Sequence, residues 1–223
     1  MKKALAIVMA LFMLAGCGQT GTADARKFKQ EYEALNGKTN DSGKSYATVT
    51  IDADNPIVYA TGQQIIDTLT KGSGIILFSF PECPWCRGAD PVFLEMCKAK
   101  GVKEVLYYNN RDQRDAKELD ASGKVVTTKE GTEEYKQILV ALGASASTYD
   151  GLNDPSIKRI YFPTVVFVSA GVVTGTFMTL DSIDDPYQPL TQQQHDELLK
   201  DYEDLYDAYA NAAKGCPLNG PAC

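Results

Sequence analysis

The sequence predicts an α/β fold in which a central mixed sheet is flanked by helices. Apolar runs of strand length at residues 74–80, 102–108 and 159–178 alternate along the chain with segments that carry helix-start and helix-stop signals. The run at 74–80 is a continuous apolar stretch, which is typical of a strand buried on both faces. We therefore expect this run to be the central strand.

The first predicted elements precede this strand. Residues 24–35 place apolar side chains on one helical side and predict a short helix, and residues 36–45 predict a turn or a flexible linker. Residues 46–52 alternate in polarity like an edge strand. Thr61 lies three residues before Gln64, which is a capping-box start for a second helix.

A cysteine pair stands between the central strand and the next helix. Cys83 and Cys86, in the sequence Cys-Pro-Trp-Cys, directly follow the 74–80 run. The helical pattern that continues from them stops at Gly101. Residues 102–108 then predict a second buried strand.

The C-terminal half holds a long connection, two strands and a last helix. The connection at 111–157 predicts a polar helix at 112–119 and another helix at 132–142. Residues 159–178 predict two apolar strands around a Ser-Ala-Gly turn. A capping box at Thr191 opens the last helix, whose apolar stripe we expect to be core.

The N-terminus predicts export from the cytoplasm. Lys2 and Lys3 precede an apolar stretch at 4–14, which is shorter than the about 20 residues that a membrane-spanning helix needs. The Leu-Ala-Gly-Cys sequence that ends at Cys17 resembles the lipobox of bacterial lipoproteins. This resemblance implies cleavage before Cys17 and a lipid on its sulfur, whereas an ordinary signal peptide or an uncleaved anchor is the alternative.

These features divide the chain into four parts. Residues 1–16 are the predicted lipoprotein signal peptide, and residues 17–45 are the lipidated N-terminus with its short helix and linker. The folded domain is expected at 46–213, with the insertion at about 111–157, and residues 214–223 form a cysteine-containing tail. The predicted location is the extracytoplasmic face of the cell membrane.

The charge balance limits the classes of partner. The 223 residues include 22 Lys and Arg against 29 Asp and Glu, a formal net charge of −7 at pH 7. An acidic surface without basic clusters argues against nucleic acid and gives no electrostatic attraction to an anionic membrane. We therefore expect no nucleic-acid partner, and attachment to the membrane through the lipid alone.

The tail contains a second cysteine pair. Cys216 and Cys223 are separated by Pro and Gly residues, which predicts a small structural disulfide loop. Two alternatives remain: the tail pair exchanges with Cys83 and Cys86 as an internal shuttle, or the four sulfurs bind zinc. Zinc would block redox use of the first pair, so the sequence predicts neither a metal nor another cofactor.

The order of elements and three short motifs resemble the thioredoxin superfamily. The motifs are the Cys-Pro-Trp-Cys sequence, Pro91 within the following helix, and Phe-Pro-Thr at 162–164 before a strand. The likeness covers about residues 58–213, and with the lipobox and tail it extends to thioredoxin-like lipoproteins of Gram-positive bacteria and, more distantly, bacteriocin transport accessory proteins. It implies a thioredoxin-like fold with a helical insertion before the cis-proline strand.

The position of the cysteine pair suggests its chemistry. Cys83 at a helix N-terminus faces unpaired backbone N–H groups and the positive end of the helix dipole, which stabilise a thiolate. The thiolate is the form that attacks disulfides, so we expect Cys83 to be the nucleophile. Cys86, within the first helical turn, is the expected resolving thiol.

Three further residues are expected to form the substrate groove. The family resemblance implies that Pro163 is cis, lies against the cysteine pair and exposes backbone with which a substrate pairs as an added strand. Trp85 offers an apolar face to a substrate, or else only covers the cysteines. Phe162 borders the groove, or else is a core aromatic residue.

The neighbours of the pair depart from the family pattern or oppose one another. Thioredoxins bury an Asp six residues before the first cysteine, where this chain has Leu77, so proton transfer needs water or another group. Glu82 is expected to disfavour a thiolate on Cys83, and Arg87 to favour it.

His195 is expected to be a solvated surface residue and Cys97 a buried, inert thiol.

The sequence thus predicts a membrane-anchored thiol-disulfide oxidoreductase. Its expected partners are extracytoplasmic protein thiols and disulfides, together with a membrane or extracellular redox partner that recharges the pair. The alternative is a non-catalytic binding or export-accessory lipoprotein in which Cys83 and Cys86 form a static disulfide. A metal carrier is a third interpretation, against which the isolation of His195 argues.

Overall fold

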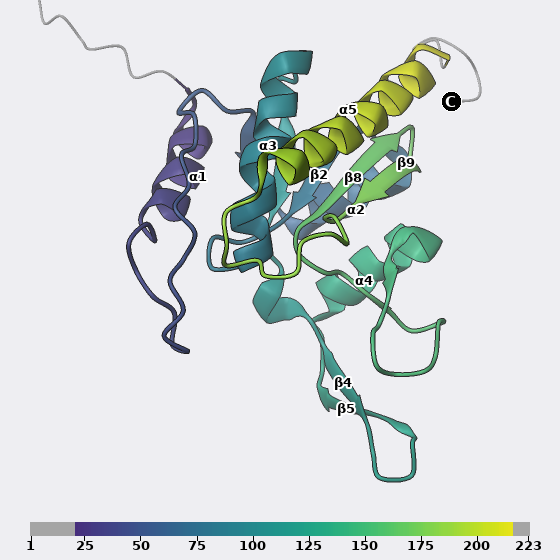
Figure 1. The fold of residues 1–223 in the computed structure, drawn as a ribbon. Coiled ribbons are helices and arrows are strands. Elements are labelled where there is room, and N and C mark those ends of the chain that lie inside the picture. Colours follow the sequence, from purple (N-terminus) through teal and green to yellow (C-terminus); the bar gives the residue numbers. More distant parts are fainter. Residues whose placement is uncertain (1–20, 216–223) are drawn as a thin grey trace, which may run out of the picture.

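The central sheet has five strands in the order β1-β3-β2-β8-β9 (Figure 1). The computed structural model describes residues 21–215. β1 (Ile57–Tyr59), β3 (Val105–Tyr108) and β2 (Gly74–Phe78) run parallel, and β8 (Thr164–Ser169) and β9 (Val172–Phe177) follow as antiparallel strands. The sheet is therefore mixed, as predicted.

Helices cover both faces of this sheet. α1 (Ala23–Glu33), α3 (Pro84–Lys100) and α5 (Gln192–Gly215) contribute side chains to the core on one face. α2 (Gly62–Lys71) and α4 (Glu133–Leu142) contribute to the core on the other. The predicted α/β class is confirmed at this level.

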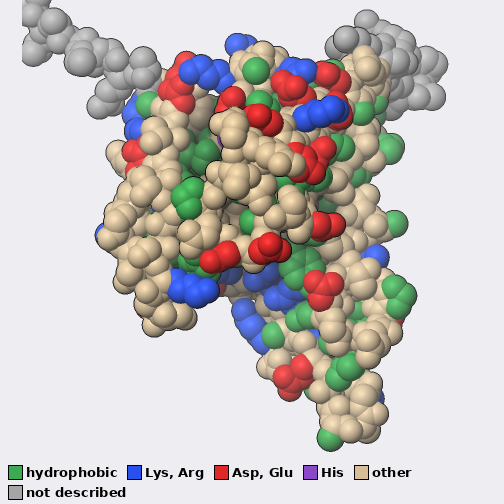
Figure 2. Space-filling view, in the orientation of Figure 1, with side chains coloured by type: hydrophobic (Ala, Val, Ile, Leu, Met, Phe, Trp, Pro, Cys, Tyr) green, Lys and Arg blue, Asp and Glu red, His purple; other side chains and the backbone are tan. Residues whose placement is uncertain are grey.

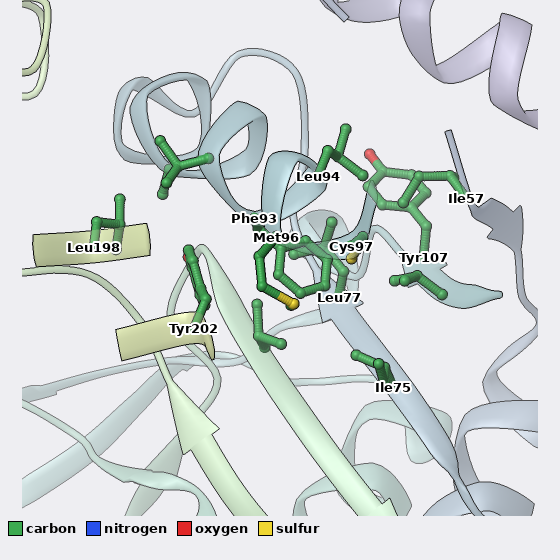
Figure 3. Packing of buried hydrophobic residues seen from close by; sticks show 14 of the residues in the cluster. Ile57, Ile75, Leu77, Phe93, Leu94, Met96, Cys97, Tyr107, Leu198 and Tyr202 are labelled. Carbon is green, nitrogen blue, oxygen red and sulfur yellow. The ribbon is translucent and has the colours of Figure 1, made fainter. Parts of the chain in front are cut away.

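The apolar run of β2 explains why two cores form. Successive strand side chains point to opposite faces, so Ile75 and Leu77 enter the α3 side while Ile76 and Phe78 enter the α2 side. Figure 3 shows the first of these cores, where Phe93 and Met96 of α3 lie with Leu77 between the sheet and α5. β2 is thus the central, doubly covered strand that its sequence predicts.

The helix boundaries follow the predicted signals. Thr61 and Gln64 form the capping box of α2, and Thr191 and Gln194 exchange the corresponding bonds at the start of α5. α3 ends at Gly101, whose φ of 69° is a left-handed conformation that glycine adopts without strain.

The edge strand predicted at residues 46–52 is wrong. This segment is extended, but side chains of the preceding residues take the bonds that a neighbouring strand would supply. The amide of Val49 donates to Asn36 Oδ1 at 3.0 Å, and the amide of Ile51 donates to Glu33 Oε1 at 2.9 Å. The alternation therefore reflects a strap over α1 and not a strand.

The polar helix predicted at residues 112–119 is also wrong. A short 3₁₀ turn, η1 (Arg111–Gln113), is followed by the hairpin of β4 (Ala116–Leu119) and β5 (Val125–Lys129). The turn at Asp120 decides the outcome, because its carboxylate accepts the amides of Ser122 and Lys124 and so closes the hairpin. The hairpin projects from the body of the molecule (Figure 1).

The remainder of the insertion completes a small second hairpin. It contains α4, the 3₁₀ turn η2 (Gly143–Ser145) and β6 (Ser147–Thr148), which pairs with β7 (Lys158–Arg159) just beyond the insertion. The insertion is accordingly part helix and part strand: the helix predicted at 132–142 is confirmed as α4, whereas the one predicted at 112–119 is replaced by the hairpin.

A buried arginine fixes the N-terminal segment to the domain. Arg87 of α3 is 1% exposed. Its guanidinium donates to the carbonyl oxygens of Tyr32, Ala47 and Pro81 and to Asn36 Oδ1, at 2.7 to 3.3 Å. Because α1 also buries Phe28 and Tyr32 completely, the segment before residue 46 is integral to the core.

Three predictions fall outside the described residues. They are the signal peptide at 1–16, the lipid on Cys17 and the disulfide between Cys216 and Cys223. Within residues 21–215, no helix combines the length and the apolarity needed to cross a bilayer.

The substitution Arg87→Met tests the role of this arginine. We expect it to lower the free energy of unfolding by about 3 kcal/mol, because buried carbonyl groups lose their only charged donor while the methionine fills part of the volume. Urea unfolding followed by tyrosine fluorescence measures the loss. Lys103→Met, at an exposed position, should change stability by less than about 0.5 kcal/mol; equal effects of the two substitutions would contradict the assignment.

Candidate functional site

Cys83 and Cys86 lie where β2 ends and α3 begins. Cys83 is the N-cap of α3, and its Sγ accepts a hydrogen bond from the backbone N–H of Cys86 at 3.2 Å. Both are free thiols, 4% and 0% exposed respectively. The helix N-terminus therefore aims a donor at the Cys83 sulfur, as the sequence predicted.

The loop before β8 meets this pair. The Phe162–Pro163 peptide bond is cis, which agrees with what the family resemblance implied. Cys83 Sγ lies 3.6 Å from the carbonyl oxygen of Phe162, to which it donates as a thiol. Segments about 80 residues apart in the sequence thus form one site.

A pocket opens beside the start of α3 and the loop that precedes β8. It has a volume of about 390 Å³ and its lining includes Trp85, Tyr161, Phe162 and Met178. The Phe162 ring packs edge-on against Phe80, with centroids 5.0 Å apart. Trp85 and Phe162, predicted to border the same groove, are therefore brought together at one surface of the molecule.

A buried carboxyl group that the sequence analysis did not single out lies behind the pair. Asp90 is one helical turn after Cys86 on α3 and is fully buried. Its Oδ2 accepts hydrogen bonds of 2.5 Å from Tyr32 Oη and Ser79 Oγ, which lie 2.7 Å from each other. Its Oδ1 is buried and has no hydrogen-bond partner among the described residues.

Burial dominates the protonation of this carboxyl group. It raises the pKa of Asp90 to about 7, although the hydrogen bonds from Ser79 and Tyr32 act in the opposite direction. Four other titratable groups face Asp90, each from its own element: Tyr32, Cys86, Tyr107 and Tyr202. Burial raises the pKa of all four, so of these five groups Asp90 is the one that titrates near neutral pH.

The resolving thiol is held in its protonated form. Burial raises the pKa of Cys86 most, and the hydrogen bond with Cys83 and the charge of Asp90 raise it further, while a hydrogen bond from Ser79 lowers it. Ser79 thus interacts with both Cys86 and Asp90. Leu77, at the position where thioredoxins carry the acid, is buried in the apolar core.

One signal in the sequence pointed to Asp90. It stands four residues after Cys86, which is the helical spacing that places two side chains on the same face. A carboxylate within an otherwise apolar helix face is uncommon unless it is paired or functional. Its partners Ser79 and Tyr32 come from other elements and carried no comparable signal.

The charged neighbours of the pair are engaged elsewhere. Glu82 Oε2 lies 3.8 Å from Arg111 Nη1, and both side chains are exposed. Arg87 donates to the N-terminal segment and to Pro81, as described above.

His195 and Cys97 lie away from the pair. His195 of α5 is partly exposed and contacts Glu95 and Asp196, at 3.1 and 3.3 Å. Cys97 is fully buried, and burial raises its pKa, as is typical of an inert thiol. Among the residues that the structure describes, no three His, Cys, Asp or Glu side chains gather as they would around a metal ion.

No family model matches the chain, and no curated protein and no solved structure shows significant similarity to it.

The buried carboxyl group predicts a specific pH dependence of stability. The pKa of Asp90 rises from 3.8 in a solvated state to about 7 in the fold. Between pH 4 and pH 7 the native state therefore binds more protons than the unfolded chain. The contribution of Asp90 to the free energy of unfolding is complete below pH 4 and is lost as the pH rises through 7. At about 1.4 kcal/mol per unit, the loss is on the order of 4 kcal/mol.

The substitution Asp90→Asn should remove this dependence. We expect the difference in free energy of unfolding between the variant and the wild type to change steadily in favour of the variant from pH 4 to pH 8, measured by urea unfolding at each pH. Asp67→Asn, at an exposed site on α2, is the control and should not produce this trend. A constant difference across the range would refute the raised pKa of Asp90.

Proposed function

We propose that this protein is a thiol-disulfide oxidoreductase of thioredoxin-like fold, anchored by lipid on the extracytoplasmic face of the membrane. The observation that carries the proposal is the contact between the Cys83 sulfur, the N–H of Cys86 and the carbonyl of Phe162. It combines a nucleophile at a helix N-terminus, a second thiol one turn away, and a cis-proline loop that offers backbone to a substrate.

The architecture supports the thioredoxin-like assignment. The cysteine pair follows the central strand β2, and the cis proline immediately precedes β8, which is hydrogen-bonded to β2. Pro91 lies inside α3 at the position that the family resemblance marks. The enlargement between β3 and β8 lies outside this common arrangement.

The proposed reaction transfers a disulfide from the substrate to the Cys83–Cys86 dithiol. The Cys83 thiolate attacks a substrate disulfide, so that a Cys83–substrate S–S bond forms as the substrate S–S bond breaks and one substrate sulfur leaves as a thiolate. Cys86 then attacks Cys83 and releases the second substrate sulfur. The substrate gains two electrons and the protein ends with a Cys83–Cys86 disulfide; the reverse sequence oxidises a dithiol.

Asp90 is suited to the second step. Cys86 must lose its proton to attack, and burial raises its pKa. Asp90 lies one turn away with an unpaired Oδ1 and a pKa of about 7, so its ionised form is available to accept a proton at neutral pH. Tyr32 and Ser79 hold the carboxylate by its other oxygen.

The pocket supports binding of a protein substrate. Trp85, Phe162 and Met178 present apolar surface in the pocket beside the cysteine site. Strand addition to the loop of Pro163 would supply the backbone hydrogen bonds to a substrate. We expect the substrate to place an extended segment across the loop and an apolar side chain in the pocket. A separate redox partner then restores the pair.

One observation favours the second candidate, a binding or export-accessory protein with a static disulfide. Cys83 and Cys86 are almost completely buried, and burial protects a disulfide from exchange. The apolar pocket would then hold a partner segment without chemistry.

The reduction potential of the pair separates the two candidates. We expect Cys83 and Cys86 to titrate together as a two-electron couple between about −270 and −120 mV when the purified protein is equilibrated in thiol buffers and mapped by alkylation and mass spectrometry. Cys83→Ser should abolish disulfide exchange, and Cys97→Ser should retain it. A pair that stays oxidised in every buffer would exclude the oxidoreductase.

The role of Asp90 has a kinetic test. Asp90→Asn should slow the release of a model disulfide substrate from its mixed disulfide with Cys83 by about 100-fold at pH 7.5, because the proton acceptor of Cys86 is lost. Stopped-flow measurement of substrate release gives this rate. The rate of the first attack, measured with Cys86→Ser, should change little; equal slowing of both steps would argue against proton transfer through Asp90.

A further inference from the structure

Arg114 is a half-buried cation beside the cysteine site. It follows η1 at the start of the insertion, and its guanidinium carbon lies 4.4 Å from the centre of the Phe162 ring. Its Nη1 donates to the carbonyl of Ile160 at 3.1 Å, and its Nε is buried without a hydrogen-bond partner among the described residues. The Nε–H group of Arg114 therefore donates no hydrogen bond to the described residues.

Two neighbouring arginines, Arg111 and Arg159, have carboxylate partners, which Arg114 lacks among the described residues. Arg111 has carboxylates of Glu82 and Asp112 within 4 Å, and Arg159 has that of Asp115 at 3.8 Å. Within residues 21–215, no carboxylate lies within ion-pair distance of Arg114. Figure 2 shows Lys and Arg side chains gathered in the hollow where the β4–β5 hairpin joins the body of the molecule.

The surroundings of Arg114 disfavour its protonated, charged form. Burial lowers its pKa most, and the positive charge of Arg159 lowers it further. The other titratable groups that face it are Tyr135 of α4, Tyr149 and Cys83, and a negative charge on any of them raises its pKa. A half-buried guanidinium without an anion has lost part of its hydration without gaining a charged partner, so an anion at this site is favoured.

Cys83 is the group beside Arg114 that becomes an anion in the proposed reaction. Arg114 and Cys83 contact the same residue, since Arg114 covers the ring of Phe162 and Cys83 Sγ bonds to its carbonyl oxygen. Burial raises the pKa of Tyr135 to about 12, which keeps this phenol neutral at physiological pH. A positive charge beside a reacting cysteine sulfur favours its thiolate over its thiol.

We propose that Arg114, from the insertion, is the counter-cation of the Cys83 thiolate and sets the reactivity of the nucleophile. The inference rests on the proposed oxidoreductase function and adds a residue to its site. When Cys83 loses its proton to solvent, Arg114 gains the anion it lacks. When the sulfur then bonds to a substrate sulfur, the negative charge passes to the leaving sulfur.

The test measures the reactivity of Cys83 alone. In full-length protein carrying Cys86→Ser, the rate of Cys83 alkylation by iodoacetamide is followed by peptide mapping from pH 5 to pH 10. Arg114→Gln should react about tenfold more slowly at pH values below its plateau and equally fast on the plateau near pH 10, because only the thiolate fraction changes.

Two further variants make the result specific. Arg114→Lys keeps the positive charge and should stay within about threefold of the parent protein at every pH. Lys124→Gln removes an exposed cation at the turn of the β4–β5 hairpin, in the same insertion, and should leave the profile unchanged. Circular dichroism establishes that each variant is folded.

The outcomes distinguish the inference from the function on which it rests. Superimposed profiles for Arg114→Gln and its parent, or a slowing that persists on the plateau, would overturn the role of Arg114 while leaving the oxidoreductase intact. If Cys83 fails to react at any pH even with Arg114 present, the oxidoreductase proposal fails and the inference fails with it.

Discussion

The first two turns of α3 bury one basic and one acidic side chain, and the surrounding chain gives both hydrogen-bond partners. Arg87 and Asp90 are each at most 1% exposed. Tyr32 of α1 serves both, because its carbonyl accepts from Arg87 and its hydroxyl donates to Asp90. Since burying either group unpaired would cost several kcal/mol, α1 and the strap after it must dock before the cysteine site is complete.

The two thiols differ because their environments differ. Cys83 caps α3, where it receives a backbone N–H and meets the loop of Phe162. Cys86 faces the interior, where burial raises its pKa and the acid Asp90 is the nearest group that titrates close to neutrality. The two thiols of the pair therefore have different surroundings, as the proposed exchange reaction requires.

Local patterns predicted the elements whose causes are local. The apolar run of β2, the capping boxes at Thr61 and Thr191, and the glycine that ends α3 each lie within a few residues of the structure they determine. The strap at residues 46–52 could not be distinguished from a strand, because its hydrogen-bond partners are side chains on α1 and beyond. Asp90 and Arg114 were missed for the same reason: their significance depends on residues brought together only by the fold.

The dependence of the centre on Tyr32 also sets the smallest functional piece of the molecule. A protease that cuts ahead of Ala23 would leave every partner of Arg87 and Asp90 in place, whereas a cut after α1 would detach Tyr32 and leave both groups exposed or unpaired. The sequence suggested a boundary near residue 46. The hydrogen bonds place the N-terminal limit of the intact centre before α1. Under the proposed lipid attachment, release from the membrane and loss of the centre would therefore differ by a single short helix.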